Sequence, residues 1–459
     1  MKFGETQSVI SLALLYAMRM LGLFMMLPVF SILGQSLTGA NGFLIGLAIG
    51  AYGLSQAVLQ VPFGLLSDRY GRKNLLVIGL LIFVAGSVVA AVSESIYGVI
   101  AGRFLQGAGA IASVLMALLS DLTREENRTR AMAVIGLSIG ISFSVALVLG
   151  PLVSSWFGLS GIFWLTACMA ASGILIVVFL IPTPVSGVRH RDSQLVKEMM
   201  HLALQNPELR RLDFGIFALH LCLTALFIVV PLELVGKFQL NQSGHWWVYL
   251  SVTGLSFVTM VPFIILGEKK RKMKPVFLGA IALLFSSSLL LAFLDGSLAE
   301  MWAGLFGFFV AFNLLEASLP SLVSKISPAG MKGTAMGFYA SSQFLGAFLG
   351  GVCGGMIYQL WGGKVVYIFC SVTAGLWFFY ALSMKRPGYT SSLMVRLDGD
   401  LNQHDALRIS GELAGIQGVE DVVVVIEERS AYLKIDRAKI DMDEIRHYSP
   451  LVSGKRAVE

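Results

Sequence analysis

The chain has 459 residues, of which 56% are hydrophobic and only 14% charged, and its mean hydropathy is +0.76. A soluble domain carries about 25% charged residues, so this composition excludes an ordinary soluble protein. Apolar stretches long enough for a helix to cross a bilayer follow one another as far as about residue 384. The sequence therefore predicts an all-α polytopic membrane protein, and it fits neither an outer-membrane barrel nor a disordered chain.

Twelve membrane-spanning helices are expected, an even number that places both termini on the same side of the membrane. Their predicted ranges are 9–33, 42–66, 74–93, 96–120, 130–156, 160–181, 212–235, 244–267, 275–294, 299–323, 333–359 and 364–384.

The loops on one side of these spans hold eighteen Lys and Arg residues, whereas the alternate loops hold only Lys237 and Lys364. Basic loops stay in the cytoplasm, so both termini are predicted to be cytoplasmic. The formal net charge of +6 is then a signal of topology and does not indicate nucleic-acid binding. The four cysteines lie inside apolar runs without metal-ligand spacing, so no disulfide framework, metal site or other cofactor is expected.

Two composition breaks divide the chain. A polar segment at 182–211 is predicted to link a six-helix bundle at 1–181 to a second at 212–384. Val61-Pro62-Phe63 recurs 200 residues later as Val261-Pro262-Phe263, which indicates a duplicated unit. Two such units in parallel orientation are typical of transporters whose halves rock around a site near the membrane midplane.

Residues 388–459 are hydrophilic and are predicted to form a small α+β cytoplasmic domain. Strands at 392–397, 419–426 and 431–435 and helices at 403–413 and 441–448 give the ferredoxin-like order, with a closing strand at 451–458. The first loop lacks the cysteine pair of metal-carrying domains of this kind. Binding of a small ligand, an anion or a partner, or structural support alone, are its open alternatives.

A ten-residue pattern follows the second span. It reads Gly64-Leu65-Leu66-Ser67-Asp68-Arg69-Tyr70-Gly71-Arg72-Lys73. Gly64 permits close helix approach, Gly71 permits the turn between two helices, and Asp68 stands at a helix end where it can meet a basic residue or a helix N-terminus.

Two further patterns lie in the fourth and fifth spans. The fourth span contains the stretch from Arg103 to Gly109, and the fifth ends with Gly150-Pro151, although Ala146, Ser154 and Ser155 stand where glycines are expected in the corresponding pattern.

These three patterns resemble motifs A, B and C of the major facilitator superfamily over residues 1–384. The resemblance implies a proton-driven efflux carrier in the bacterial inner membrane, with a small-molecule substrate and protons as its partners. It implies a cytoplasmic latch formed by Gly64, Asp68, Arg69, Gly71, Arg72 and Lys73, with Asp121 as a further member. It also associates Arg103 with proton coupling and Gly150 and Pro151 with helix packing.

Four charged or titratable residues, Arg19, Arg103, His220 and Glu316, lie deep inside the predicted spans, where charge is costly, and Asp213 and Glu233 lie nearer the ends of the seventh span. The four deep residues are candidates for proton coupling, because low-dielectric surroundings favour the neutral form of a carboxyl group and histidine titrates near neutral pH. The alternatives are that Glu316 neutralises a buried arginine, that the arginines form structural contacts and that His220 is packed in the core.

Polar residues in the same spans are candidates for lining the substrate cavity: Gln56, Gln60, Asn313, Tyr339 and Gln343. Polar side chains also hold membrane helices together, so helix packing is the alternative. The leading hypothesis is a proton-coupled antiporter for a small amphipathic or hydrophobic compound, and not an enzyme. The alternatives are a sugar or metabolite symporter or uniporter, and a membrane sensor that signals through residues 388–459.

Overall fold

The computed structural model describes residues 3–123, 125–183, 197–293, 297–328 and 331–385 of the helical region. Beyond it, residues 390–397, 402–426, 429–436, 439–440 and 444–445 are described. The chain forms two compact units. Unit 1 holds Met1–Pro184, Arg211–Leu319 and Gly337–Met384, and unit 2 holds Val185–Arg210, Pro320–Met336 and Lys385–Glu459.

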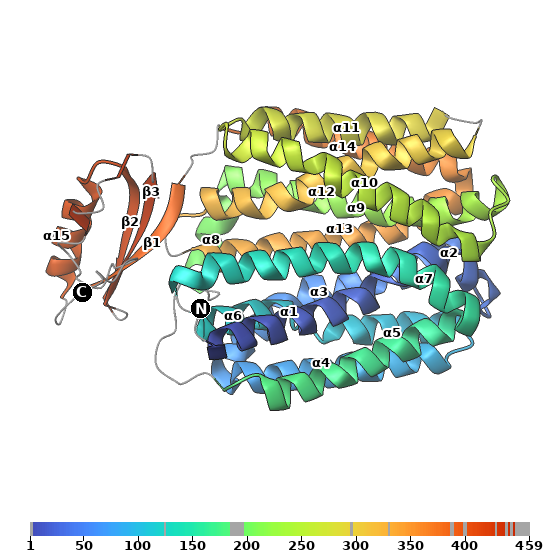
Figure 1. The fold of residues 1–459 in the computed structure, drawn as a ribbon, viewed down its shortest axis with the longest axis horizontal. Coiled ribbons are helices and arrows are strands. Elements are labelled where there is room, and N and C mark those ends of the chain that lie inside the picture. Colours follow the sequence, from blue (N-terminus) through green and yellow to red (C-terminus); the bar gives the residue numbers. More distant parts are fainter. Residues whose placement is uncertain are drawn as a thin grey trace. The chain divides into compact units, whose positions relative to one another are not determined.

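Long helices account for the first part of the chain (Figure 1). Asn41 caps α3 by accepting a hydrogen bond from the Leu44 amide, and Ser95 caps α5 in the same way. The helices are α1 (Phe3–Phe24), α2 (Leu27–Leu33), η1 (Gly34–Ser36), α3 (Gly42–Tyr70), α4 (Arg72–Val92), α5 (Ile96–Ala108), α6 (Ala112–Leu122), α7 (Glu125–Leu175) and η2 (Ile176–Leu180).

A second series of helices follows residues 184–196. Within it α11 packs along α14, and α10 packs against α7 from the first series. The helices are α8 (Lys197–Gln205), α9 (Pro207–Gly236), η4 (Gln242–Gly244), α10 (His245–Glu268), α11 (Met273–Phe293), α12 (Leu298–Ile326), α13 (Lys332–Trp361) and α14 (Gly363–Leu382).

Eleven stretches of the described residues are long and apolar enough to cross a membrane, where twelve were predicted. The difference lies in Arg130–Leu180, a stretch of 51 residues. A helix of that length measures about 77 Å, more than twice the ~30 Å of a bilayer's hydrocarbon. Gly158 breaks it with φ 65° and ψ −166°, and Figure 1 shows α7 turning back on itself. The predicted spans 130–156 and 160–181 are thus joined without a loop.

Two other predicted spans are interrupted. The range 96–120 is divided into α5 and α6 at Gly109–Ile111, and the range 9–33 into α1 and α2 at Met25–Met26. The second break lies against α7, because a Cβ added to Gly150 would overlap the carbonyl oxygen of Met25. Pro151 lies inside α7 next to this contact. Gly150 thus lies at a close approach of two helices, and the packing role of Gly150 and Pro151 stays a prediction.

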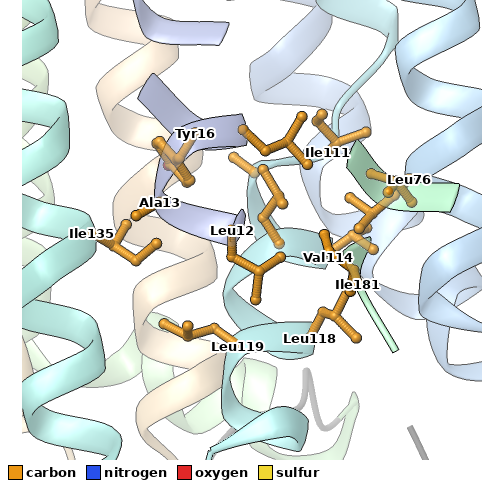
Figure 2. Packing of buried hydrophobic residues seen from close by; sticks show 14 of the residues in the cluster. Leu12, Ala13, Tyr16, Leu76, Ile111, Val114, Leu118, Leu119, Ile135 and Ile181 are labelled. Carbon is orange, nitrogen blue, oxygen red and sulfur yellow. The ribbon is translucent and has the colours of Figure 1, made fainter. Parts of the chain in front are cut away.

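A cluster of buried apolar side chains holds the first helices together (Figure 2). Leu12 from α1, Leu76 from α4 and Leu118 from α6 are almost completely buried in it. Ile135 from α7 and Ile181 after η2 complete the packing. Helices α1, α4, α6 and α7 therefore share one interior.

The C-terminal residues form a three-stranded antiparallel sheet with one helix. The elements are β1 (Thr390–Arg396), α15 (Gln403–Ala414), β2 (Val419–Val425) and β3 (Ser430–Asp436), and the sheet order is β1-β3-β2. Ile409 and Leu413 of α15 are buried in the same cluster as Leu433 of β3. The strands at 392–397, 419–426 and 431–435 and the helix at 403–413 agree with these elements to within two residues. The closing strand at 451–458 and most of the helix at 441–448 lie outside the described residues.

Candidate functional site

The ten-residue pattern after the second span forms a tight turn between two helices. Gly71 ends α3 and begins α4 with φ 90°, a conformation that side chains disfavour and glycine accepts. Its amide donates to the carbonyl of Ser67, and the Ser67 hydroxyl donates to the carbonyl of Gly64. We call the end of the helical bundle that holds this turn, with Arg69, Arg72 and Lys73, the basic end. The turn fixes where Arg72 begins the next helix.

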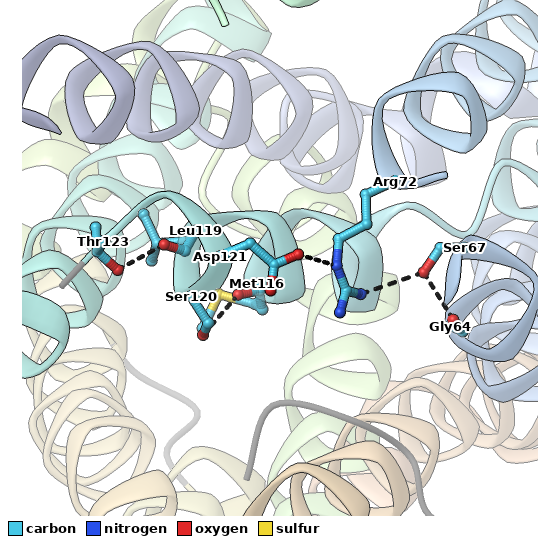
Figure 3. Close-up of polar contacts among 8 residues, drawn as sticks. All are labelled: Gly64, Ser67, Arg72, Met116, Leu119, Ser120, Asp121 and Thr123. Atoms are coloured by element: carbon cyan, nitrogen blue, oxygen red, sulfur yellow. Dashed lines mark hydrogen bonds and ion pairs between the residues drawn. The ribbon is translucent and has the colours of Figure 1, made fainter. Parts of the chain in front are cut away.

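Arg72 forms an ion pair with Asp121 on α6 (Figure 3). The Arg72 Nε donates to Asp121 Oδ2, and Arg72 Nη1 donates to the Ser67 hydroxyl at 3.4 Å. The side chains are only 7% and 13% exposed, which shields the pair from solvent. The structure thus brings together Arg72 and Asp121, two residues that were predicted as a latch.

The other predicted latch residues have different surroundings. Lys73 donates to the carbonyls of Val178 and Ile181 at 3.1 and 2.9 Å, so it binds the end of η2. Arg69 is exposed and stacks over the ring of Tyr70, with 5.5 Å between the guanidinium carbon and the ring centroid. Asp68 lies in α3, and its side chain is outside the described part of the structure.

Two buried arginines meet at Tyr52 in the middle of the first helices. Arg19 on α1 donates from Nη2 to the Tyr52 hydroxyl at 2.6 Å. Arg103 on α5 lies over the ring of the same tyrosine, with its guanidinium carbon 5.1 Å from the centroid. Arg103 also donates to Gln106 Oε1 at 2.8 Å. We call Arg19, Tyr52 and Arg103 the arginine cluster.

The second series of helices brings His220, Glu316 and Gln343 together from α9, α12 and α13. The Gln343 amide nitrogen lies 2.9 Å from His220 Nε2 and 3.2 Å from Glu316 Oε1, so its two N–H groups reach both residues. His220 Nδ1 lies 3.9 Å from Glu316 Oε2. We call His220, Glu316 and Gln343 the carboxyl cluster. In it the Gln343 amide is a common hydrogen-bond partner of the carboxyl group and the imidazole.

The two clusters approach each other between the first and second series of helices. Phe344, the neighbour of Gln343, packs edge-on against Tyr52 with 6.1 Å between ring centroids. Among the described residues, however, Glu316 forms no ion pair with either arginine. The structure therefore gives no support to Glu316 as the neutralising partner of Arg19 or Arg103.

The predicted cavity-lining residues mainly join helices. Gln56 donates to the carbonyl of Gly107 at 2.9 Å, and Asn313 donates to the Ser256 hydroxyl at 2.8 Å. The backbone carbonyl of Gln60 accepts a hydrogen bond from Ser113, and Tyr339 is buried. These contacts favour helix packing for Gln56 and Asn313, while Gln343 belongs to the carboxyl cluster.

Glycines on α3 and α13 allow the two backbones to touch at the opposite end of the bundle. A Cβ on Gly46 would overlap the carbonyl oxygen of Gly351, and one on Gly355 would overlap the carbonyl oxygen of Gly42. The Phe43 amide donates to Gln359 Oε1 at 2.9 Å beside them. We call Gly42, Gly46, Gly351 and Gly355 the glycine seam, and its end of the bundle the seam end.

Sequence reasoning missed Tyr52 and the glycine seam. A tyrosine in an apolar helix carries no signal of its own, so nothing in one sequence distinguishes Tyr52. The seam had a visible signal, because glycines four residues apart are typical of membrane helices in close contact. The spacing occurs at Gly42 and Gly46 and again at Gly351 and Gly355. Among the described residues there is no group of three potential metal ligands.

Comparison with known proteins supports the resemblance seen in the motifs. A family model described as Major Facilitator Superfamily matches residues 12–351 and 212–394 in two overlapping alignments. The inner membrane transport protein YajR of Escherichia coli is 46% identical, over 96% of this chain and 97% of its own length. The multidrug resistance protein MdtH of Aeromonas salmonicida is 25% identical, over 74% and 84%. The crystal structure of the human organic anion transporter MFSD10 superposes with a TM-score of 0.63 at 21% identity, covering 82% of this chain and 99% of that one.

Proposed function

The chain belongs to the Major Facilitator Superfamily of membrane transporters, and from this premise we propose that it exports a small amphipathic or hydrophobic compound in exchange for protons. Transport proceeds by alternating access, in which two six-helix bundles, 1–181 and 212–384, open the pathway first at one end and then at the other. The substrates named for the relatives differ from one another, so none of them is transferred to this chain.

The proposed topology has twelve membrane crossings. The 51-residue stretch Arg130–Leu180 supplies two of them, because its length and its break at Gly158 fit a helical hairpin. The basic end faces the cytoplasm, where the positively charged loops of an inner-membrane protein remain. The seam end then faces the periplasm, and the structure represents a state that is closed on the periplasmic side. The ferredoxin-like domain at 388–459 is cytoplasmic in this topology.

The latch is proposed to act at the cytoplasmic end. Arg72 and Asp121 hold the ends of α4 and α6 together, and Gly71 sets the angle at which α3 meets α4. Asp68, Arg69 and Lys73 complete the latch, which meets the second bundle only in the conformation open to the periplasm, whereas the Arg72–Asp121 pair lies within the first bundle and is already formed in the state closed at the seam end. Glu268 lies in the corresponding loop of the second half without a glycine turn, so the latch is asymmetric.

Proton coupling is assigned to the carboxyl cluster, and the observation that carries this assignment is the Gln343 amide held between His220 and Glu316. The amide orients both groups, and His220 Nδ1 lies 3.9 Å from Glu316 Oε2, so a proton can pass between them once a small movement or one water brings them within hydrogen-bond reach.

Proton movement in liposomes tests this function. Purified full-length protein is reconstituted with a trapped pH dye, and a panel of neutral, cationic and anionic amphipathic compounds is added outside without a pH gradient. Exchange predicts that uptake of a compound makes the interior more alkaline, because protons leave as the compound enters. We expect Glu316→Gln to abolish the pH change while leaving exchange of labelled for unlabelled compound intact.

Glu300→Gln is the matched control, since this carboxylate lies at the start of the same helix, where it accepts a hydrogen bond from the Ser297 amide. It should behave as the wild type. Acidification of the liposome interior during uptake would indicate the symporter alternative. Uptake without any change in the internal pH would indicate a uniporter. Absence of uptake for every compound would favour the sensor alternative, in which residues 388–459 report ligand binding without solute flux.

A further inference from the structure

Arg19 is a buried charge with unused hydrogen-bonding capacity. Its side chain donates once, to Tyr52, whereas Nε and Nη1 have no hydrogen-bond partner among the described residues. Arg19 is 3% exposed and Arg103 1%, and Arg103 Nε is also without a partner in the described structure. A guanidinium inside a membrane protein is costly unless an anion or several acceptors compensate it. The burial of two guanidinium groups against one tyrosine therefore requires a compensating interaction.

No carboxylate of the described residues forms an ion pair with either arginine. The latch residue Asp68, whose side chain is not described, cannot supply one. It lies sixteen residues beyond Tyr52 on the same helix, which separates their positions by about 24 Å. Within the described part of the chain, two positive charges thus lie together with no negative charge paired to them in this conformation.

The position of Arg19 fits a substrate site. Sixteen residues separate it from the start of α1 and fourteen from the end of α2, so it lies about halfway along this span. Transporters of this architecture bind substrates near the membrane midplane, between the two bundles. The contact of Tyr52 with Phe344 on α13 lies at such a boundary between the first and second series of helices.

The surroundings of the arginine cluster are aromatic on both sides. Tyr52 packs edge-on against Phe83 at 6.4 Å and against Phe344 at 6.1 Å between ring centroids. These three rings form one buried cluster with Ala170. A ligand that meets this region therefore finds cationic donors next to apolar walls. The complementary molecule has an anionic head and an aromatic or apolar body.

We propose that Arg19, together with Arg103, binds the carboxylate of an amphipathic organic acid, which is the substrate class of this transporter. The inference rests on the proposed transport function and narrows its substrate. The Tyr52 hydroxyl holds the Arg19 guanidinium in place, and the remaining N–H groups of Arg19 receive the carboxylate. Because both guanidinium groups are shielded in this conformation, the acid enters when alternating access opens the pathway to them.

Equilibrium binding to the purified full-length protein tests this inference without any gradient. Isothermal titration compares benzoate, phenylacetate and 4-phenylbutyrate with their primary amides and with the corresponding amines. We expect at least one acid to bind while its amide and amine bind at least tenfold more weakly, since a hydrogen bond to a charged group is worth about a factor of ten or more. If no acid binds to the wild-type protein more tightly than its amide, the inference is wrong. This outcome does not depend on whether any variant folds.

Substitutions then identify the positively charged residue that binds the acid. Arg19→Gln should reduce the affinity for the acid at least tenfold, and Arg19→Lys should keep the preference for the acid over its amide. Arg408→Gln, which removes an exposed arginine on α15, should change nothing. An acid affinity that survives in Arg19→Gln would overturn the assignment to this residue.

The two proposals can fail separately. Acid binding that depends on Arg19, without proton-coupled flux in liposomes, would contradict the transport proposal alone. Proton-coupled flux of amides and amines, with no acid binding, would contradict the substrate class alone.

Discussion

At the scale of single residues, the contact between Arg72 and Asp121 illustrates how a short motif acts through its local geometry. Gly71 adopts a backbone conformation that other residues disfavour, and this places Arg72 at the first position of α4. The guanidinium then reaches Asp121 on α6 and the hydroxyl of Ser67 on α3. Three helix ends are joined by one side chain.

Removal of one partner should therefore be costly. Asp121→Ala leaves the guanidinium of Arg72 shielded from water and without its carboxylate, which typically destabilises a protein by about 3–5 kcal/mol. We expect a clearly lower midpoint of thermal unfolding for the purified protein in detergent.

The exposed pair between Arg408 and Glu412 on α15 provides the control. Its side chains are 58% and 38% exposed, and such pairs contribute about 0–1 kcal/mol. Glu412→Ala should leave the unfolding midpoint of the helical region unchanged. Equal midpoints for Asp121→Ala and the wild type would show that the latch pair adds nothing to stability.

At the scale of elements, most helix positions could be predicted from the sequence, because long apolar runs have few alternative structures in a membrane protein. The bounds of α3, α10 and α13 differ from the predicted spans by only a few residues. The interruptions at Met25–Met26 and Gly109–Ile111 could not be predicted, since both lie within apolar sequence. They depend on contacts such as that of Gly150 with the Met25 carbonyl, which only the packed helices reveal.

In the candidate site, the charged residues could be predicted from the sequence, whereas the residues that contact them could not. Charged residues inside apolar spans stand out in any sequence, so Arg19, Arg103, His220 and Glu316 could be found. Their partners could not, because Tyr52 and Phe344 are ordinary residues of apolar helices and gain their role from neighbours far away in the chain.

The glycine seam makes a prediction about one helix contact. The Cβ of Gln359 lies 2.9 Å from the position that a Cβ would take on Gly42, so the two helices must separate by roughly 1 Å to reach the spacing of about 3.8 Å in a disulfide. In a protein whose four native cysteines have been replaced, we expect Gly42→Cys and Gln359→Cys to cross-link on oxidation and to stop transport until the disulfide is reduced.

The seam residues themselves provide the comparison. Adding Gly46→Leu to this pair should prevent the cross-link, because the new side chain would occupy the space of the Gly351 carbonyl. Gly254→Leu on α10, where nothing lies within 4 Å of an added Cβ, should leave the cross-link intact. Unchanged cross-linking in the Gly46→Leu protein would mean that α3 and α13 do not meet at these glycines.

At the scale of the whole molecule, unit 1 combines four features. The glycine seam closes one end, the Arg72–Asp121 pair lies at the other, and the arginine and carboxyl clusters lie between them. A carrier with these parts must close the pathway at one end before it opens the pathway at the other. If both ends moved together, protons and substrate could pass through without being coupled.

Distance measurements at both ends test this claim most directly. Spin labels at Tyr70 and Lys269 report on the basic end, and labels at Trp156 and Trp361 report on the seam end, since all four residues are exposed. Pulsed electron spin resonance would compare the wild type with Gly46→Leu, which disfavours closure of the seam without requiring a known substrate. The account predicts that Gly46→Leu lengthens the seam-end distances and shortens the basic-end distances. Distances that change in the same direction at both ends, or a seam end that does not open, would contradict it.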